Sequence, residues 1–259
     1  MPKKGPKPDY GIDAPDLVRL FFMSGVSAFV IFILLYLNLD TQFYWRGLLL
    51  SVFAIIALYL IGMGCLMIYE SKVKKIYERN TILDRLKLRG SEYILDVGCG
   101  RGLMLIGAAK RLVTGKAIGV DIWQSKDQSK NTMEATLSNA QMECVADKID
   151  VKTADMRSLP FEDASFDIVV SHWVVHNLEK DLDRKKALSE MVRVLRSGGT
   201  LALTDISNRR EYLTELTALG LLNIYAVSSS LRDVILGGLS FGSFRPATIF
   251  ALKPNDLGK

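Results

Sequence analysis

Two long runs without a charged residue limit what this chain can fold into. The first covers residues 20–37 and the second covers residues 47–69, so they contain 18 and 23 residues. At a rise of about 1.5 Å per residue, a helix over the first run would be roughly 27 Å long, close to the hydrocarbon thickness of a bilayer. Tyr44 and Trp45 lie between the runs, and both residue types favour the membrane–water interface. The pattern predicts a transmembrane helical hairpin over residues 20–69.

Basic residues on either side of the two runs predict the orientation of the hairpin. Arg46 is the one basic residue between the runs, whereas four precede them and seven lie in residues 70–89, directly after them. These are Lys3, Lys4, Lys7 and Arg19 before the first run, and Lys72, Lys74, Lys75, Arg79, Arg85, Lys87 and Arg89 after the second. Because positive residues stay on the cytoplasmic side, both termini are expected there. A core helix or a secretory signal is the alternative, but a signal peptide is shorter and lacks a second run directly after it.

The sequence therefore divides into four predicted parts. These are a cytoplasmic N-terminal tail (1–19), two transmembrane helices (20–69), a basic juxtamembrane linker helix (70–89) and a folded domain (90–259). The linker could rest on anionic head groups or form a solvated helix face. All of the formal net charge of +5 lies in residues 1–89, since residues 90–259 hold 21 basic and 21 acidic residues. A domain without net charge gives little support for nucleic-acid binding.

Cysteine and histidine are too sparse to indicate a metal centre or a disulfide framework. The three cysteines, Cys65, Cys99 and Cys144, are widely separated, and His172 and His176 are the two histidines of the chain. Paired cysteines at short spacing, which are typical of structural zinc sites, are absent from the sequence. No metal is expected.

After residue 90 short β-type segments alternate with helical ones. Strands are predicted over 93–97, 117–121, 149–153, 168–171, 200–205, 223–227 and 247–252, and helices over 103–112, 129–146, 183–195 and 210–219. This alternation predicts an α/β fold with a doubly wound parallel sheet, in which ligands bind at the carboxyl ends of the strands. An apolar, glycine-interrupted stretch precedes the last strand and could be a lid or a packed helix; it contains Leu231, Val234, Ile235, Leu236, Leu239, Phe241 and Phe244.

A glycine-rich turn follows the first predicted strand. The segment ILDVGCGRG places Gly98, Gly100 and Gly102 before a helix, where glycine permits a tight turn and free N–H groups can receive a carboxylate. A dinucleotide site would have a glycine at the position of Leu103. Asp121 ends the second strand 19 residues after Gly102, and a carboxylate there can accept hydrogen bonds from two ribose hydroxyls.

Residues 86–254 resemble the class I S-adenosylmethionine-dependent methyltransferases. The resemblance lies in ILDVGCGRG, the acidic residue of GVDIW, TADMRSLPFEDASFDIVVS and EMVRVLRSGGTLALTDI. It implies a Rossmann-like methyltransferase sheet with S-adenosylmethionine as the methyl donor. The donor-binding residues that it implies are Asp96, Gly98, Cys99, Gly100, Gly102, Asp121, Ile122, Asp155, Met156 and Ser171. Among these, Asp96, Gly98 and Gly100 are expected at the methionine end, Asp121 at the ribose, and Asp155 with Met156 at the adenine. Trp123 could cover the adenine or the entrance, or serve in packing.

The segment SHWVVHN, which follows the fourth strand, contains the candidate catalytic residues His172 and His176. A neutral imidazole can take a proton from a hydroxyl, thiol or amine acceptor. A donor-binding or capping role for either histidine is the alternative, because methyl transfer can rest on positioning alone. Nucleic-acid methyltransferases resemble one another in an Asn/Asp-Pro-Pro-Tyr-like segment or a Pro-Cys nucleophile, and the sequence has neither here.

These features predict an integral membrane methyltransferase whose catalytic domain faces the cytoplasm. The expected acceptor is a hydrophobic, membrane-associated small molecule such as a lipid, quinone, isoprenoid or thiol, and the expected partners are the bilayer and that acceptor. One alternative is methylation of a membrane protein that docks on small residues of the hairpin, namely Ser24, Ala28, Gly62 and Gly64. Another alternative is a non-enzymatic donor-binding sensor.

Overall fold

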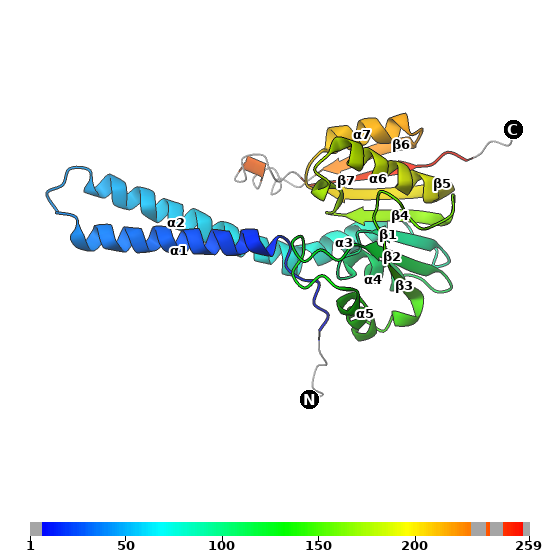
Figure 1. The fold of residues 1–259 in the computed structure, drawn as a ribbon, viewed down its shortest axis with the longest axis horizontal. Coiled ribbons are helices and arrows are strands. Elements are labelled where there is room, and N and C mark those ends of the chain that lie inside the picture. The colour runs from blue at the N-terminus through cyan, green and yellow to red at the C-terminus, as the bar shows by residue number, and fades with distance from the viewer. Residues whose placement is uncertain (1–6, 229–236, 239–245, 256–259) are drawn as a thin grey trace. The chain divides into compact units, whose positions relative to one another are not determined.

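The computed structural model of the chain describes residues 7–228, 237–238 and 246–255. Its internal contacts separate two compact units (Figure 1). We call residues 11–77 and 124–130 the hairpin unit, and residues 1–10, 78–123 and 131–259 the sheet unit. The seven residues of the predicted apolar stretch between 231 and 244 lie outside the described residues.

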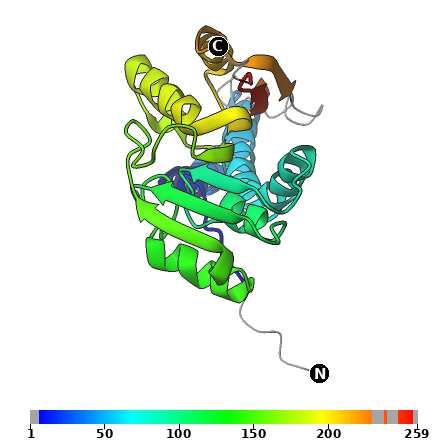
Figure 2. The ribbon, with the colours of Figure 1, turned by 90° about the vertical axis from the view of Figure 1, so that its right-hand side faces the viewer.

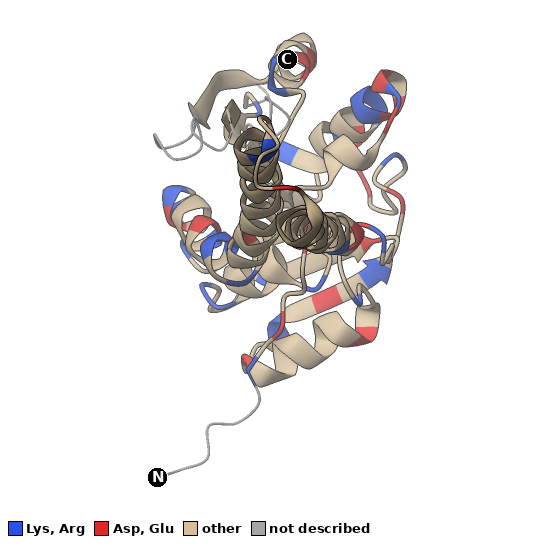
Figure 3. Ribbon diagram, turned by 90° about the vertical axis from the view of Figure 1, so that its left-hand side faces the viewer, with Lys and Arg blue, Asp and Glu red and all other residues tan. Residues whose placement is uncertain are grey.

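Two antiparallel helices make up most of the hairpin unit. Helix α1 (Pro15–Asn38) and helix α2 (Arg46–Tyr69) have 24 residues each. Their charged residues, Asp16, Arg19 and Arg46, lie near helix ends, so both helices are tan over most of their length in Figure 3. Both are long and apolar enough to cross a membrane, judged by length and composition.

Small residues bring α1 and α2 together. An added Cβ at Gly25 would lie 2.7 Å from the Ile61 side chain, and one at Gly64 would lie 2.9 Å from the Phe22 ring. These distances are too short for a larger residue without movement. Gly62 differs, because nothing lies within 4 Å of its added Cβ. Gly25 and Gly64 are therefore part of the packing within the hairpin.

The basic segment after α2 begins with a π-helical turn (Glu70–Lys74) and continues as helix α3 (Lys75–Arg85). Lys75 is 2% exposed, and its ammonium lies 3.1 and 3.2 Å from the two carboxylate oxygens of Asp13. Arg79 is also buried. The interpretation of the whole segment as a surface for head groups is therefore wrong for Lys75 and Arg79. Of the seven basic residues, those exposed are Lys72, Arg85, Lys87 and Arg89.

A seven-stranded mixed sheet forms the centre of the sheet unit. Its strands are β1 (Tyr93–Val97), β2 (Lys116–Asp121), β3 (Ile149–Thr153), β4 (Phe166–His172), β5 (Leu195–Asp205), β6 (Leu222–Ser228) and β7 (Ala247–Leu252). The order is β3-β2-β1-β4-β5-β7-β6. Strands β1 to β5 are parallel, whereas β7 runs antiparallel to β5 and β6. The predicted Rossmann-like topology is confirmed, but the expectation of a wholly parallel sheet is wrong. An antiparallel strand needs no right-handed crossover, so β7 can enter between β5 and β6.

Helices flank both faces of the sheet (Figure 2). The connection from β1 to β2 through α4 (Leu103–Ala109) runs toward one sheet edge, and the connection from β4 to β5 through α6 (Asp181–Val194) runs toward the other. Right-handed crossovers then place α4 and α6 on opposite faces. Helix α7 (Arg209–Ala218) packs with α6, and α3 packs on α4, where Leu83 lies beside Gly107.

Helix α5 (Met133–Met142) is shorter than the predicted helix over 129–146. The side chain of Thr132 accepts a hydrogen bond from the Ala135 N–H, which is the geometry of a helix N-cap. The residues before this cap, 124–130, belong to the hairpin unit. The predicted helix began too early, because the polar pattern before Thr132 looked helical whereas the Thr132 cap sets the start of α5.

The core lies where helices cover the sheet on both sides. Ile94, Leu95 and Val97 of β1 are fully buried, as expected for a central parallel strand with two covered faces. The chain reverses direction across the sheet between β1 and β4, so the carboxyl ends of these strands lie at a topological switch point. Ligands of doubly wound sheets bind at this place.

Candidate functional site at the carboxyl edge of the sheet

The glycine turn after β1 has a left-handed backbone at each of its three glycines. Gly98, Gly100 and Gly102 have φ of 74°, 52° and 85°. The N–H groups of Gly98 and Cys99 donate to the Val120 carbonyl at 2.8 and 3.0 Å, which fixes the turn against the end of β2. A Cβ on Gly98 would lie 2.5 Å from the Val174 side chain. Both the φ value and this contact require glycine at position 98.

Asp96 presents a buried acceptor under the turn. Its Oδ2 accepts the Leu105 N–H at 2.8 Å, whereas its Oδ1 has no hydrogen-bond donor among the described residues. Burial raises the pKa of Asp96 to about 7, against the opposing effects of the Leu105 hydrogen bond and of nearby His172. A cationic ligand group could supply the missing donor and return the carboxylate to its charged form.

Cys99 belongs to the packing of the turn. An added Cβ on Gly119 of β2 would lie 2.8 Å from its sulfur, and burial raises the pKa of the Cys99 thiol. A buried thiol of this kind is a poor nucleophile. Cys99 therefore has a packing role in the turn, against Gly119 of β2.

Asp121 lies at the end of β2 and faces the glycine turn. Its Oδ2 accepts the Gly100 N–H at 2.8 Å, and its Oδ1 accepts the Trp123 N–H at 2.6 Å and the Asn131 amide at 3.2 Å. Each carboxylate oxygen has two lone pairs, so Oδ2 can still accept from a ligand hydroxyl. The three donors hold the carboxylate plane in one orientation.

The residues after Asp121 form a platform beside β3. The Trp123 indole donates to the Thr153 hydroxyl at 2.7 Å, and Trp123 adopts a φ of 61°, which is uncommon for a bulky residue. Ile122 is 47% exposed, so it has apolar surface available to a ligand ring. These two residues lie where the sequence predicts the ribose and adenine.

Asp155 is already paired within the chain. The Arg157 guanidinium contacts both of its oxygens at 2.6 to 3.1 Å, and this pairing holds the pKa of Asp155 below its usual range. Arg157 also contacts Asp183 at 3.0 Å. Met156 packs against the core cluster of the sheet. Contact of Asp155 with an adenine amine stays a prediction, and it would require a shared carboxylate.

Ser171 and His172 end β4 with little exposure. The Ser171 hydroxyl donates to the Val97 carbonyl at 3.0 Å, which joins the ends of β4 and β1. The His172 side chain is 8% exposed and stacks on Trp173 with 5.1 Å between ring centroids. Its Nε2 lies 3.6 Å from Glu78 Oε2, beyond hydrogen-bond distance. This imidazole is poorly placed to receive a proton from a bulky acceptor.

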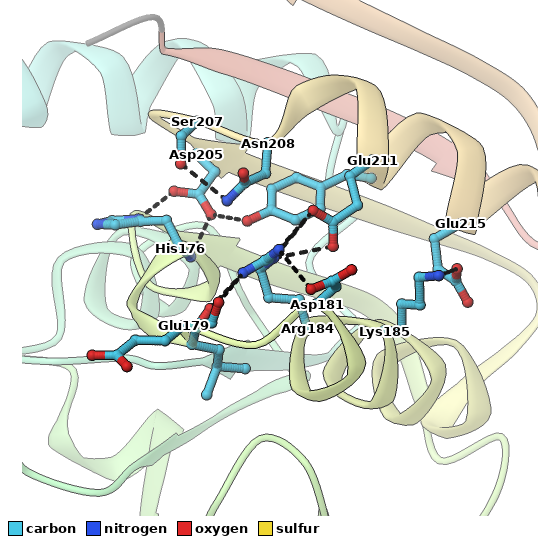
Figure 4. A network of polar contacts seen from close by, with 12 residues as sticks. His176, Glu179, Asp181, Arg184, Lys185, Asp205, Ser207, Asn208, Glu211 and Glu215 are labelled. Carbon is cyan, nitrogen blue, oxygen red and sulfur yellow. Dashed lines mark hydrogen bonds and ion pairs between the residues drawn. The ribbon is translucent and has the colours of Figure 1, made fainter. Parts of the chain in front are cut away.

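His176 has the surroundings of an oriented base (Figure 4). It lies in the 3₁₀ turn Val175–Asn177, and its Nδ1 lies 2.5 Å from Oδ1 of Asp205 at the end of β5. Oδ2 of Asp205 accepts the His176 N–H and the Tyr212 hydroxyl, both at 2.9 Å. Because a carboxylate can only accept, Nδ1 is the donor and a neutral ring carries its lone pair on Nε2. The side chain is 22% exposed, so Nε2 can be reached.

Further contacts hold the turn that carries His176. Arg184 on α6 donates to the Leu178 carbonyl at 2.8 Å and contacts both carboxylate oxygens of Glu211 on α7 (Figure 4). Burial raises the pKa of Tyr212, so its hydroxyl stays a donor toward Asp205. The dyad of His176 and Asp205 is therefore supported from two helices.

The structure brings most of the predicted site residues to one edge of the sheet. Asp96, Asp121, Ser171 and the glycine turn lie at the ends of neighbouring strands β1, β2 and β4. Sequence reasoning missed Asp205, although it ends a predicted strand as Asp121 does. It also missed the roles of Tyr212 and Asn131. Among the described residues, no group of three or more His, Cys, Asp or Glu side chains could hold a metal ion.

This chain is similar to known methyltransferases. A family model described as a methyltransferase domain matches residues 95–203. Demethylmenaquinone methyltransferase of Bacteroides fragilis is 30% identical over 183 residues, which cover 70% of this chain and 69% of that protein. Methyltransferase GfsG of Streptomyces halstedii is 32% identical over 137 residues, which cover 53% of this chain and 44% of that protein. The chain thus spans less than half the length of several curated relatives that it matches.

Solved structures share the fold of the sheet unit. A structure of geranyl diphosphate methyltransferase in complex with S-adenosylmethionine superposes with a TM-score of 0.56 and 17% sequence identity. The match covers 83% of this chain and 92% of that one. At this level of identity the likeness shows the fold alone.

Proposed function

Because this chain belongs to the class I S-adenosylmethionine-dependent methyltransferases, we propose that it is a membrane-anchored enzyme that methylates a hydrophobic small molecule. The observation that carries the proposal is the dyad of His176 and Asp205 at the same sheet edge as the glycine turn. In this proposal the glycine turn at the carboxyl edge of the sheet binds the methyl donor, and His176 of the dyad is the base.

The residues at the edge fit the donor. When bound, S-adenosylmethionine supplies a methyl group activated by a sulfonium. Asp96 Oδ1, a buried acceptor without a donor among the described residues, suits the ammonium of the methionine end, and the positive φ of Gly98 shapes the turn next to it. Asp121 suits the ribose hydroxyls, and Ile122 with Trp123 suits the adenine side. These assignments use polar groups that are oriented before a ligand arrives, which lowers the cost of binding.

His176 is the proposed base. Its Nε2 would take the proton of an acceptor hydroxyl while the acceptor oxygen bonds the methyl carbon and the bond between that carbon and the donor sulfur breaks, so that S-adenosylhomocysteine leaves. Asp205 would stabilise the resulting imidazolium. Asp205 also keeps Nδ1 protonated, so that Nε2 is the basic nitrogen. We assign His172 a role in the donor site, near Asp96.

The exposed apolar surface of α1 and α2 supports membrane anchoring. Met23 and Leu58 are 70% and 73% exposed, and 11% of the apolar stretch in each helix is buried. A core helix of a water-soluble domain would be mostly buried. Leaving this much apolar surface in water is unfavourable by about 25 cal/mol per Å², so a bilayer is the environment that suits it. The charge distribution supports a cytoplasmic sheet unit.

The acceptor class follows from the anchor and from a relative. An anchored enzyme meets acceptors that are dissolved in the bilayer, and the Bacteroides relative is named for a quinone substrate. Lipids, quinones, isoprenoids and hydrophobic thiols are therefore the acceptors to test first.

Two alternatives are less well supported. Methylation of a docked membrane protein would use small residues of the hairpin, but an added Cβ at Gly64 meets Phe22 of the same hairpin. A donor-binding sensor would have no need for a histidine oriented by a buried carboxylate.

The test is a label-transfer assay on the full chain in lipid nanodiscs. The protein is incubated with S-adenosylmethionine carrying a labelled methyl group and with a total membrane extract, and the products are partitioned into lipid and protein fractions. We expect label in the lipid fraction, and its loss in His176→Ala, which serves as the control. Label in protein would favour the docking alternative, and donor binding without any transfer would favour the sensor.

A further inference from the structure

Seven residues of the loop between β2 and α5 belong to the hairpin unit. The chain leaves the sheet unit after Trp123 and returns to it at Asn131, and the intervening residues 124–130 group with residues 11–77. We call residues 124–130 the excursion. Its composition is polar, so apolar burial does not explain its place.

The two residues that flank the excursion both donate a hydrogen bond to one carboxylate oxygen. Trp123, before it, donates its N–H to Asp121 Oδ1 at 2.6 Å, and Asn131, after it, donates its amide to the same oxygen at 3.2 Å. Trp123 and Lys130 adopt left-handed backbone angles, with φ of 61° and 54°. Such angles are uncommon for residues other than glycine, and surrounding contacts usually stabilise them. The two residues that flank the excursion in sequence are thus also two of the donors that orient Asp121.

The middle of the excursion is held by the segment before α1. Ala14 donates its N–H to the Asp127 carbonyl at 2.9 Å, and Ser129 donates its N–H to the Ile12 carbonyl at 2.9 Å. Ile12 donates its own N–H to the Ser129 hydroxyl at 2.8 Å. Asp13 and Gln128 form an antiparallel bridge, and the Gln128 amide donates to Asp13 Oδ1 at 3.1 Å. Residues 12–14 thus pair with 127–129 like two short strands.

An ion pair at the base of the hairpin fixes residues 12–14 in turn. Lys75 contacts both Asp13 oxygens at 3.1 and 3.2 Å and the Gly11 carbonyl at 3.3 Å. The Asp13 N–H donates to the Ser71 hydroxyl at 3.1 Å. Ser71 and Lys75 are 3% and 2% exposed and lie in and just after the π-helical turn. Short π-helical turns are frequent at functional positions in helices.

We propose that Lys75 and Asp13 are positioning residues for the methyl donor, because they hold the excursion in the conformation that orients Asp121. The proposal rests on the donor-binding role of Asp121 given above. It makes the base of the membrane hairpin a determinant of donor affinity. When the ion pair is removed, Trp123 and Lys130 can relax to ordinary backbone angles, and Asp121 loses the two donors that fix its Oδ1.

The experiment measures binding of S-adenosylhomocysteine by calorimetry to the full chain in nanodiscs. The variants are Lys75→Met and Asp13→Asn, and the matched control is Lys72→Met, an exposed lysine three residues earlier. We expect the dissociation constant to rise at least 10-fold in the first two and to stay within twofold in the control. Hydrogen exchange over residues 121–131 should become faster in both variants, with or without ligand.

A second background separates positioning from general damage. In Asp121→Ala, the added Lys75→Met change should alter affinity by less than twofold, because the group that Lys75 positions is gone. An equal loss in both backgrounds, or wild-type affinity in Lys75→Met and Asp13→Asn, would overturn the proposal. If Lys75→Met does not fold, Gln128→Ala decides, with an expected loss of at least threefold. Failure of the wild type to bind S-adenosylhomocysteine would instead count against the proposed function, and the exchange data would still report on the excursion.

Discussion

The two units of the chain treat apolar side chains in opposite ways. In the sheet unit, Leu95 and Val97 are fully buried, whereas Met23 and Leu58 of the hairpin unit are mostly exposed. The first arrangement is what water enforces on a central strand. The second leaves apolar side chains on the outside of two long helices.

The two units also differ in where their buried polar groups lie. In the sheet unit they gather at the carboxyl edge, where Asp96, Asp121 and Asp205 end three parallel strands. In the hairpin unit the buried Lys75 pairs with Asp13 just after the π-helical turn that follows α2. On the function proposed above, the polar groups at the edge bind a ligand, whereas the ion pair of the hairpin unit holds the chain.

The largest effect is expected at His176. His176→Ala should lower turnover by roughly 10² to 10⁴-fold, because general base catalysis contributes about that much. The affinity for S-adenosylhomocysteine should stay within about twofold of the wild type. Asp205→Asn should lower turnover in the same direction, since it no longer enforces protonation at Nδ1. Turnover of labelled donor with the lipid acceptor and calorimetry on the same samples check both values. Unchanged turnover in both variants would show that positioning alone accounts for the rate.

The glycine turn should respond next most strongly. Gly98→Val places a Cβ 2.5 Å from Val174 and forces a β-branched residue to a φ of 74°. Donor affinity should fall about 10²-fold, at the upper end of what an overpacked site loses. Calorimetry with S-adenosylhomocysteine measures this loss. The control is Gly220→Ala, which also has positive φ but has open space around the added Cβ. If Gly98→Val and Gly220→Ala lost donor affinity equally, the loss would come from backbone strain at a positive φ and not from the contact with Val174.

Asp121→Ala should weaken donor binding by about 1 to 3 kcal/mol, because it leaves ribose hydroxyls without an acceptor. It also releases the Gly100, Trp123 and Asn131 donors. Turnover at saturating donor should change little. If Asp121→Ala bound the donor normally but turned over slowly, Asp121 would act in methyl transfer and not in ribose binding.

Local patterns predicted the parts of the site that lie within one short segment. The glycine turn and Asp121 follow their strands directly, so strand periodicity and glycine spacing were enough to find them. The pair of His176 and Asp205 was not found, because the partners are 29 residues apart and meet only when β5 lies beside β4. The excursion was missed for the same reason, since Gln128 and Asp13 are 115 residues apart. Strand direction in β7 could not be read from the apolar pattern of Ala247–Leu252.

The pH dependence of donor binding should report Asp96. Burial raises its pKa to about 7, so in the donor-free protein the carboxyl is mostly protonated at pH 6 and mostly ionised at pH 8. If only the ionised form pairs with the ligand ammonium, the dissociation constant of S-adenosylhomocysteine should be about 10-fold higher at pH 6 than at pH 8. Asp96→Asn should bind more weakly and lose this dependence.

The same group has the opposite effect on folding. A carboxyl whose pKa is raised in the folded state stabilises the fold fully below its unfolded value near 4, and this stability is lost as the pH rises through about 7. The donor-free wild type should therefore lose more stability between pH 5 and pH 8 than Asp96→Asn, as thermal unfolding can measure. If thermal stability changed with pH equally in the wild type and in Asp96→Asn, a group other than Asp96 would account for the pH dependence.

The smallest effect on the sheet unit should come from the middle of the hairpin. Gly64→Leu places a side chain against Phe22, whereas Gly62→Leu enters open space, and both changes give the helix the same gain in propensity. Gly64→Leu should therefore have the lower unfolding temperature in nanodiscs, by a few degrees for about 1 kcal/mol. Both variants should bind S-adenosylhomocysteine like the wild type, because Gly64 lies within α2, away in sequence from the ion pair at its base. A loss of donor affinity in Gly64→Leu but not in Gly62→Leu would show that packing along the whole hairpin, and not its base alone, acts on the donor site.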